Sequence, residues 1–136
     1  MNEQNKAYLE RLNKQLIKNL ERDTGLKVFQ DNVSEAELKE ELDEVYQYII
    51  FSTGGFTKPD TSKFTLVQSV TVQVAAETIS DLDGLQLDII TSLSGVANSS
   101  SYFFLSSDKG QIQKGKQDKY VDALTFEFTR SIKNVC

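Results

Sequence analysis

The run from Tyr120 to Lys133 constrains the fold more than any other part of this chain. Apolar and polar side chains alternate along it, which is the period of a strand with one buried face. The buried face is predicted to carry Leu124, Phe126, Phe128 and Ile132, and the other face Thr125, Glu127, Thr129 and Ser131. A matching run lies earlier, from Phe64 to Ala76, so a sheet is the expected framework.

Bulk composition limits the classes of protein to which the chain can belong. The 136 residues are expected to form a single domain over 1–136. A net charge of -5 and a pI near 4.8 argue against a dedicated DNA or RNA binder, which would carry a basic footprint. The chain has no histidine, so the commonest general base and metal ligand are missing.

The cysteine content and the N-terminus indicate a compartment. Cys136 is the only cysteine, so no intrachain disulfide is possible, which fits a reducing environment. No apolar run approaches the ~18 residues of a membrane span. The first six residues lack the basic and then apolar plan of a signal peptide. A soluble protein made in the cytoplasm, with no membrane partner, is therefore expected.

The first third of the chain predicts helices. Leucines recur at helical spacing between Gln4 and Arg22, and Gly25 is a plausible left-handed cap after them. Residues 26–29 are expected to form a short extended piece. Ser34 and Glu37 have the spacing of a capping box, which predicts a short helix ending near Leu42.

The remaining two thirds predict strands around one further helix. A strand is expected over 45–51, a loop punctuated by glycines and Pro59 over 52–62, and the long strand over 64–76. Ser80 is predicted to cap a helix that ends near Leu93. A short strand over 102–105, a turn over 106–110 and a returning piece over 111–113 precede the last strand. The predicted core includes Leu66, Val70, Val72, Leu124, Phe126 and Phe128, and the aromatic residues Tyr46, Tyr48, Tyr102, Phe103 and Phe104 are also expected in the sheet core.

This order of elements predicts an α+β fold. The expected architecture is a small antiparallel or mixed sheet of about four strands. An N-terminal helix, and a helix between strand pairs, pack on one face of it.

No residue pattern supports catalysis, a cofactor or a metal ion. The loop Ser52–Phe56 lacks the spacing and the lysine of a phosphate-binding loop. Asp81, Asp83 and Asp88 resemble a metal cluster, but the first two lie where aspartates stabilise the start of a helix. We therefore assign no catalytic, cofactor or metal residue and do not expect an enzyme.

Charge and strand patterning favour assembly with other protein chains. The N-terminal third is acidic around residues 35–44, whereas residues 109–133 are rich in lysine, and opposite patches on one chain suit head-to-tail association. The second face of the strand over 64–76 holds Thr, Ser and Gln without any charge, which is poor protection against pairing between chains. Ordinary solvated surface is the alternative interpretation of both features.

The order and texture of these elements resemble the tail terminator, or tail-completion, proteins of long-tailed bacteriophages. The matching features are the N-terminal amphipathic helix, the strand Val45–Phe51, the Gln/Val/Thr strand Leu66–Val74, the acidic-capped helix Ser80–Leu93 and the last strand Val121–Arg130. The resemblance covers nearly the whole chain. It implies a virion structural protein, assembled in the host bacterial cytoplasm, that closes into a homo-hexameric ring at the tail and neck.

The resemblance also implies partners for such a ring. It would cap the major tail tube protein, join the tail to the head-neck connector proteins, and let DNA pass through its lumen without sequence-specific binding. The loops over 52–63 and 106–119 are the candidate contacts, and their proposed interface residues are Gly54, Gly55, Phe56, Lys58, Lys114, Lys116 and Lys119. Two alternatives stay open: another connector component, such as a stopper or adaptor, and an unrelated small protein-binding module.

Overall fold

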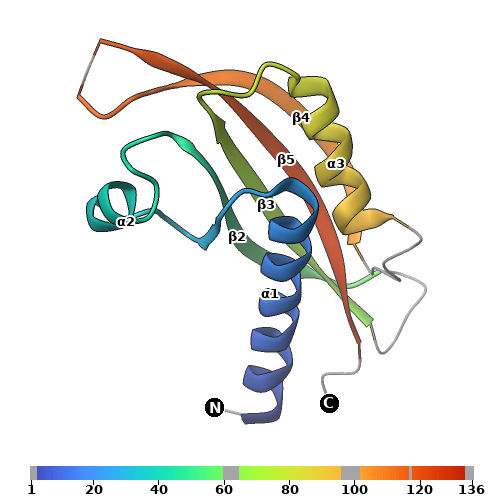
Figure 1. Ribbon diagram of the computed structural model, residues 1–136. Coiled ribbons are helices and arrows are strands. Elements are labelled where there is room, and N and C mark those ends of the chain that lie inside the picture. The colour runs from blue at the N-terminus through green and yellow to red at the C-terminus, as the bar shows by residue number, and fades with distance from the viewer. Residues whose placement is uncertain (1–2, 60–64, 96–101, 117, 134–136) are drawn as a thin grey trace.

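A five-stranded mixed sheet is the framework of the computed structural model, which describes residues 3–59, 65–95, 102–116 and 118–133 (Figure 1). The elements in chain order are α1 (Glu3–Thr24), β1 (Val28–Gln30), α2 (Glu35–Glu40), β2 (Gln47–Thr57), β3 (Thr65–Ala76), α3 (Leu82–Ser94), β4 (Tyr102–Gln113) and β5 (Tyr120–Lys133). The sheet order is β1-β2-β3-β5-β4. The predicted α+β class is confirmed, with five strands in place of about four.

The two alternating runs of the sequence pair with each other at the centre of the sheet. β3 and β5 are antiparallel, with Val70 opposite Phe128 and Val72 opposite Phe126. β2 and β4 flank this pair, also antiparallel, and only the short β1 runs parallel to its neighbour β2. The last strand in sequence is therefore an interior strand, paired on both sides.

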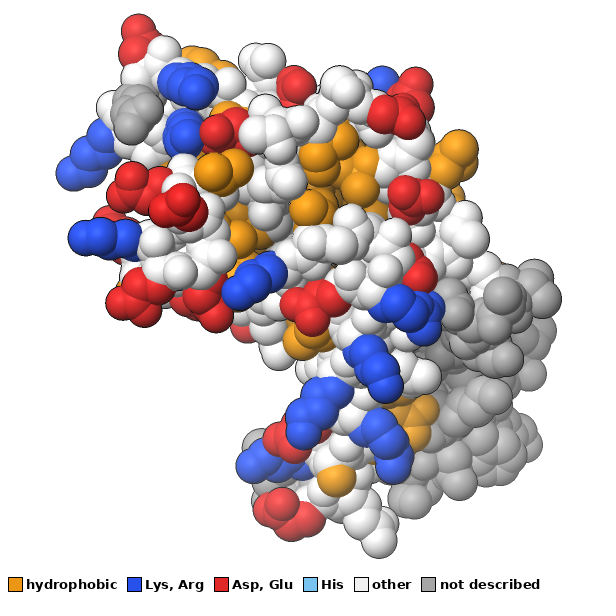
Figure 2. All heavy atoms as spheres, viewed as in Figure 1, with side chains coloured by type: hydrophobic (Ala, Val, Ile, Leu, Met, Phe, Trp, Pro, Cys, Tyr) orange, Lys and Arg blue, Asp and Glu red, His pale blue; other side chains and the backbone are white. Residues whose placement is uncertain are grey.

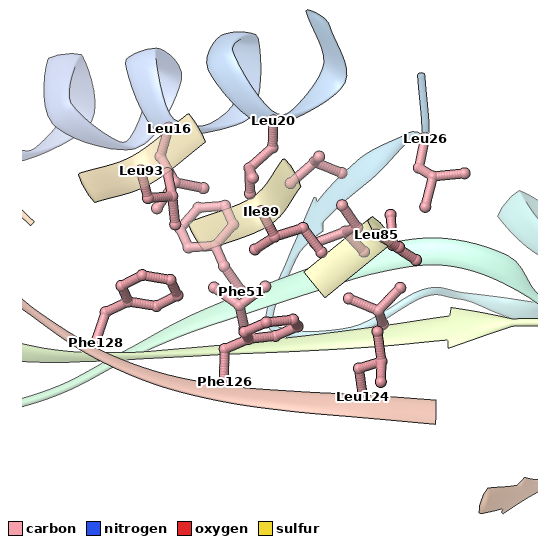
Figure 3. Packing of buried hydrophobic residues seen from close by; sticks show 14 of the residues in the cluster. Leu16, Leu20, Leu26, Phe51, Leu85, Ile89, Leu93, Leu124, Phe126 and Phe128 are labelled. Atoms are coloured by element: carbon pink, nitrogen blue, oxygen red, sulfur yellow. The ribbon is translucent and has the colours of Figure 1, made fainter. Parts of the chain in front are cut away.

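Both longer helices lie on the same face of the sheet (Figures 1 and 3). Leu16 and Leu20 of α1 and Ile89 of α3 point toward the sheet, where they join Phe51 and the aromatic residues of β5 in one buried cluster (Figure 3). Of the predicted core, Val70, Val72, Leu124, Phe126 and Phe128 are fully buried, and Leu66 is half-buried at the end of β3. The regularly spaced leucines of α1 thus form one apolar face of the helix, and that face packs on the apolar face of the sheet.

The first two helix termini use the cap chemistry that the sequence indicates. Gly25 has φ of 74°, and its N–H donates to the carbonyl of Glu21 at 3.0 Å, so the predicted left-handed cap is confirmed. At α2, the Ser34 hydroxyl accepts from the N–H of Glu37 and the Glu37 carboxylate accepts from the N–H of Ser34. The predicted capping box is confirmed, although α2 ends at Glu40 rather than Leu42.

The cap of α3 is Asp81, so the prediction of Ser80 is wrong. The Asp81 carboxylate accepts from the N–H of Gly84 at 2.9 Å. A charged acceptor makes a stronger bond to the free N–H groups of a helix terminus than a hydroxyl does, and it also suits the helix dipole. This cap explains the glycine inside the first turn, because a Cβ on residue 84 would collide with the Asp81 carboxylate.

β2 continues to Thr57, so the loop predicted from residue 52 is wrong for residues 52–57. The pairing with β3 shifts register between Thr53 and Phe56, which makes Gly54 and Gly55 a bulge within the strand. The glycines therefore mark a bulge rather than the end of the strand, because β3 offers partners along its whole length. The remainder of the predicted loop, over 60–62, lies outside the described residues.

β4 is one strand of 12 residues, and the turn predicted over 106–110 is wrong. Asp108 lies opposite Thr125 and Gly110 opposite Ala123, because β5 is long enough to pair with all of β4. A register shift between Phe104 and Ser106 leaves a bulge at Leu105. The prediction that Phe103 is in the core is also wrong, since 66% of its surface is exposed.

A buried arginine is the largest polar feature inside the core. Arg130 of β5 lies directly opposite Gln68 of β3, with 2% of its surface exposed. Its Nε donates to Gln68 at 3.0 Å, and its Nη1 donates to Asn13 of α1 at 2.9 Å and to the Tyr102 hydroxyl at 3.2 Å. Burial raises the pKa of Tyr102, and the nearby Arg130 partly opposes this. These bonds link α1, β3, β4 and β5 at one end of the core.

Phe126→Ala should lower the free energy of unfolding by about 3–5 kcal/mol, because it leaves a cavity under both helices. Chemical denaturation gives this value. Phe103→Ala is the matched control, since that ring is mostly in solvent, and we expect a change within about 0.5 kcal/mol. Equal effects of the two changes would contradict the register of β5.

Arg130→Met should destabilise the fold by about 1–3 kcal/mol, because it leaves the Gln68 and Asn13 side chains without their buried donor. Adding Gln68→Leu should recover part of this loss, since two apolar residues then face each other across β3 and β5. Denaturation of the single and double variants measures both effects. Additive losses would show that the two side chains do not act as a pair.

Candidate assembly surfaces

Both longer helices pack on one face of the sheet, and we call the other face the open face, although Tyr48, Ala75 and Val121 on it are buried. Strand alternation assigns it Tyr48, Ile50 and Ser52 of β2, Val67, Ser69, Thr71, Gln73 and Ala75 of β3, Val121, Ala123, Thr125, Glu127, Thr129 and Ser131 of β5, and Phe103, Ser106, Asp108, Gly110 and Ile112 of β4. Of these positions Glu127 and Asp108 carry charge, and Lys133 lies opposite Thr65 at the end of the same face. The polar face predicted for β3 thus continues across four strands with few charged residues.

The open face is apolar and slightly hollow near the start of β2. A depression of about 100 Å³ is lined by side chains that include Tyr48, Ile50, Ala75, Ala123 and Ile112. Around it the face carries hydroxyl groups, and the Thr71 hydroxyl donates to the Glu127 carboxylate at 3.1 Å. Apolar side chains framed by polar ones are a composition found in protein contacts.

Aromatic rings line one end of this face, where β2 begins. The ring of Tyr48 meets Phe29 edge-on at 6.4 Å and Tyr46 at 5.9 Å between centroids. Tyr48 is buried, whereas Tyr46 and Phe29 are half-buried. Burial raises the pKa of the Tyr48 hydroxyl, with a smaller contribution from Tyr46. Tyr48 is therefore buried, but on the open face rather than in the core cluster, whereas Tyr102 and Phe104 pack against that cluster.

Lys114 anchors the tip of the β4–β5 hairpin to the start of β2 and the end of β3. Its Nζ lies 2.7 Å from Oε1 of Glu77 and 5.8 Å from the centre of the Tyr46 ring. Both charged side chains are mostly buried, with 17% and 14% of their surfaces exposed. The hydrogen bond from Lys114 holds the pKa of the Glu77 carboxyl below its usual range, although burial opposes this. Lys114 was proposed as an interface residue, and in this structure its charge is already paired.

A cleft of about 350 Å³ separates this hairpin tip from α2. Its lining includes Glu35, Leu38 and Glu44 on one side and Tyr46 and Lys114 on the other. Glu44 has φ of 60° and its N–H donates to the Leu38 carbonyl at 2.7 Å, so the chain turns sharply here. The cleft combines acidic and basic side chains without a grouping that would hold one particular ligand.

The other proposed interface residues divide between two ends of the sheet. Lys116 and Lys119 are exposed at the hairpin tip, whereas Gly54, Gly55, Phe56 and Lys58 are exposed at the opposite end, where β2 finishes (Figure 1). The Gln68 amide donates to the Gly54 carbonyl at 3.3 Å, which fixes the bulge against β3. The structure therefore does not bring the two groups together.

The N-terminal third also carries a basic surface that sequence reasoning missed. Arg11, Lys14 and Lys18 are exposed on α1, and Figure 2 shows Lys and Arg side chains gathered over that helix. The spacing of three and four residues, which places these three on one helix face, was the signal in the sequence. Acidic side chains concentrate at residues 35–44, around α2, as the sequence predicts.

The described residues contain no group of three His, Cys, Asp or Glu side chains that could hold a metal ion. Of the aspartates weighed for this role, Asp81 caps α3 and Asp83 lies 2.7 Å from the Nζ of Lys109. None of the described helices is long and apolar enough to cross a membrane. Cys136 lies outside the described residues.

Comparison with known protein families and with curated proteins finds no match to this chain. The assembly surfaces therefore rest on the geometry of the sheet.

The ion pair between Lys114 and Glu77 should be measurable as a coupling free energy of about 1 kcal/mol or less at pH 7. A double-mutant cycle of Lys114→Met and Glu77→Gln, read by denaturation, isolates it. Because the pKa of Glu77 is lowered in the folded state, this stabilisation is complete above the unfolded value of about 4.3 and is lost as pH falls below it. A coupling that persisted unchanged in acid would contradict the ion pair.

Proposed function

We propose that this chain is a structural ring subunit of a long-tailed bacteriophage, the terminator that caps the tail tube and joins it to the head. The observation that carries the proposal is the open face of the sheet. A sheet face with an apolar hollow and few charged residues is unusual for a surface in bulk solvent, and a ring turns such a face toward its enclosed lumen.

The two ends of the sheet supply two separate docking surfaces. The β4–β5 tip with Lys116 and Lys119 lies at one end, and the end of β2 with Phe56 and Lys58 lies at the other. If the strands run roughly along the axis of a ring, these ends belong to its two opposite faces. A terminator needs two such faces, because one binds the last ring of the tail tube and the other binds the neck.

The charge of the open face suits a channel for DNA. In a ring with the helices outside, the open face lines the lumen, and its charged positions are Glu127, Asp108 and, at the end of β5, Lys133. Proteins hold DNA by neutralising phosphates with lysine and arginine. A lumen with few such residues lets DNA pass without retaining it, whereas Arg11, Lys14 and Lys18 of α1 lie on the helix side.

The test is to mix the purified protein with a polymerising tail-tube protein and measure tube lengths by electron microscopy. We expect shorter tubes, each with a ring at one end, and a mean length that falls as more protein is added. Tubes of unchanged length without a cap would contradict the terminator role. Binding to neck proteins in that case would favour a stopper or adaptor.

Charge reversal of the hairpin tip, Lys116→Glu with Lys119→Glu, tests which end of the sheet meets the tube. The change avoids Lys114, whose ion pair supports the fold. The matched control is Lys14→Glu with Lys18→Glu on α1, which reverses the same number of exposed lysines on the helix side. Weaker capping by the tip variant alone would place the tip on the tube, and unchanged capping would place it at the neck.

A further inference from the structure

The sheet ends on both sides in edges that lack the usual protection against pairing. β4 is the last strand on one side over all its 12 residues. On the other side β1 pairs with β2 only as far as Phe51, so Ser52–Thr57 forms a second free edge in the described sheet. Natural edges are usually blunted by charge, proline or short length. Ser52–Thr57 contains no charge and no proline, and β4 contains only the neighbouring Asp108 and Lys109.

Both edges carry exposed apolar side chains. Six large apolar side chains stand exposed among the described residues, and four lie on these edges, Ile112 of β4 being the least exposed of them. The other three are Phe56 on the β2 edge and Phe103 and Leu105 on the β4 edge. Their exposed fractions are 48%, 66% and 62%. Each edge also has a bulge, at Gly54–Gly55 and at Leu105. A bulge can protect an edge by turning a charged residue outward. Neither of these bulges contains a charged residue, and the bulge in β4 exposes Leu105.

The two apolar stretches lie at the same level of the sheet. Following the register across the four antiparallel strands, Ser52 aligns with Thr71, Glu127 and Ser106, and Phe56 aligns with Gln68, Arg130 and Tyr102. The free part of β2 therefore matches the segment from Tyr102 to Ser106 of β4. In a ring, neighbouring subunits are related by rotation about the ring axis. If the strands run along that axis, residues at the same height in the sheet of each subunit lie next to each other.

From this correspondence we infer that the β4 edge of one subunit pairs with the β2 edge, Ser52–Thr57, of a second copy. The inference rests on the proposed ring and names its subunit contact. β2 and β4 run in opposite directions, so the contact is antiparallel and the alternation of the sheet continues into the next subunit. Because the two edges differ, the contact is head-to-tail and generates a ring when the rotation closes.

Phe56, Phe103 and Leu105 are the apolar anchors of this contact, since they lose their exposure when the edges meet. β1 limits the register, because its pairing with β2 blocks any approach to residues before Ser52. The neighbour can therefore add its strand only to the second half of β2.

Disulfide trapping tests the contact directly. In a Cys136→Ser background, Ser52→Cys and Ser106→Cys are made as separate proteins, mixed and oxidised, both free and bound to tube ends. Residues 52 and 106 lie at the same height in the sheet, and both side chains are on the open face. Residues directly opposite each other in an antiparallel pair have Cα atoms close enough for a disulfide. We expect cross-linked dimers from the mixture and none from either variant alone. Ile112→Cys, further along the same face of β4, is the matched control and should not cross-link to Ser52→Cys.

A second measurement uses charge instead of a cross-link. Phe103→Lys with Leu105→Lys should reduce cross-linking of the mixture about tenfold or more, because a lysine pair is then buried at the contact. Leu87→Lys is the control, since Leu87 is equally exposed, at 65%, but lies on α3. Equal cross-linking by edge and control variants would overturn the inference.

The outcomes separate the edge contact from the terminator role. Selective cross-linking of Ser52→Cys to Ser106→Cys without capping of tubes would support the contact and contradict the terminator. Capping of tubes without that cross-link, in free or tube-bound protein, would overturn the edge contact alone. The double variant Ser52→Cys with Ser106→Cys should give a ladder that ends at a closed ring, and an unlimited ladder would contradict a closed ring.

Discussion

The antiparallel pairing of β3 with β5 is the interaction on which the rest of the structure depends. It aligns the valines of β3 with the aromatic residues of β5 on one face, and both helices bury their leucines against that surface. β2 and β4 then attach to the two outer sides of the pair. The same register places Gln68 opposite Arg130, so the one buried cation of the described core obtains its partners from the pairing that also builds the apolar cluster.

Local patterns in the sequence were sufficient to predict some of the helices and strands, but not others. The alternation in β3 and β5 and the caps at Gly25 and Ser34 were predictable, because a strand period or a helix cap depends on residues a few positions apart. The extensions of β2 and β4 were not predictable, because the glycines and polar residues there form strand only when a long partner lies beside them. The buried position of Arg130 also required the register, although its place between Phe128 and Ile132 on the inner face was visible.

The proposed interface residues show the same division. Lys116, Lys119 and Phe56, which the sequence suggested as interface residues, are exposed. Lys114 differs because Glu77, far away in sequence, meets it across the sheet. The sequence also contained the uncharged face of β3, but not its continuation over β2, β5 and β4 or the matched levels of the two edges. The continuous face and the aligned edges are properties of the whole sheet. A sheet covered by helices on one face, with two different free edges, is suited to a closed assembly.

The interior position of β5 has a consequence for synthesis of the chain. β5 follows every other strand of the sheet in sequence, and its contact between Gln68 and Arg130 spans 62 residues. While the ribosome adds α3 and β4, β3 has no β5 to pair with, and the helices lack the part of their packing surface that β5 supplies. Folding must therefore wait for the last strand and close a long loop, which favours slow, late acquisition of structure and a transient need for chaperones.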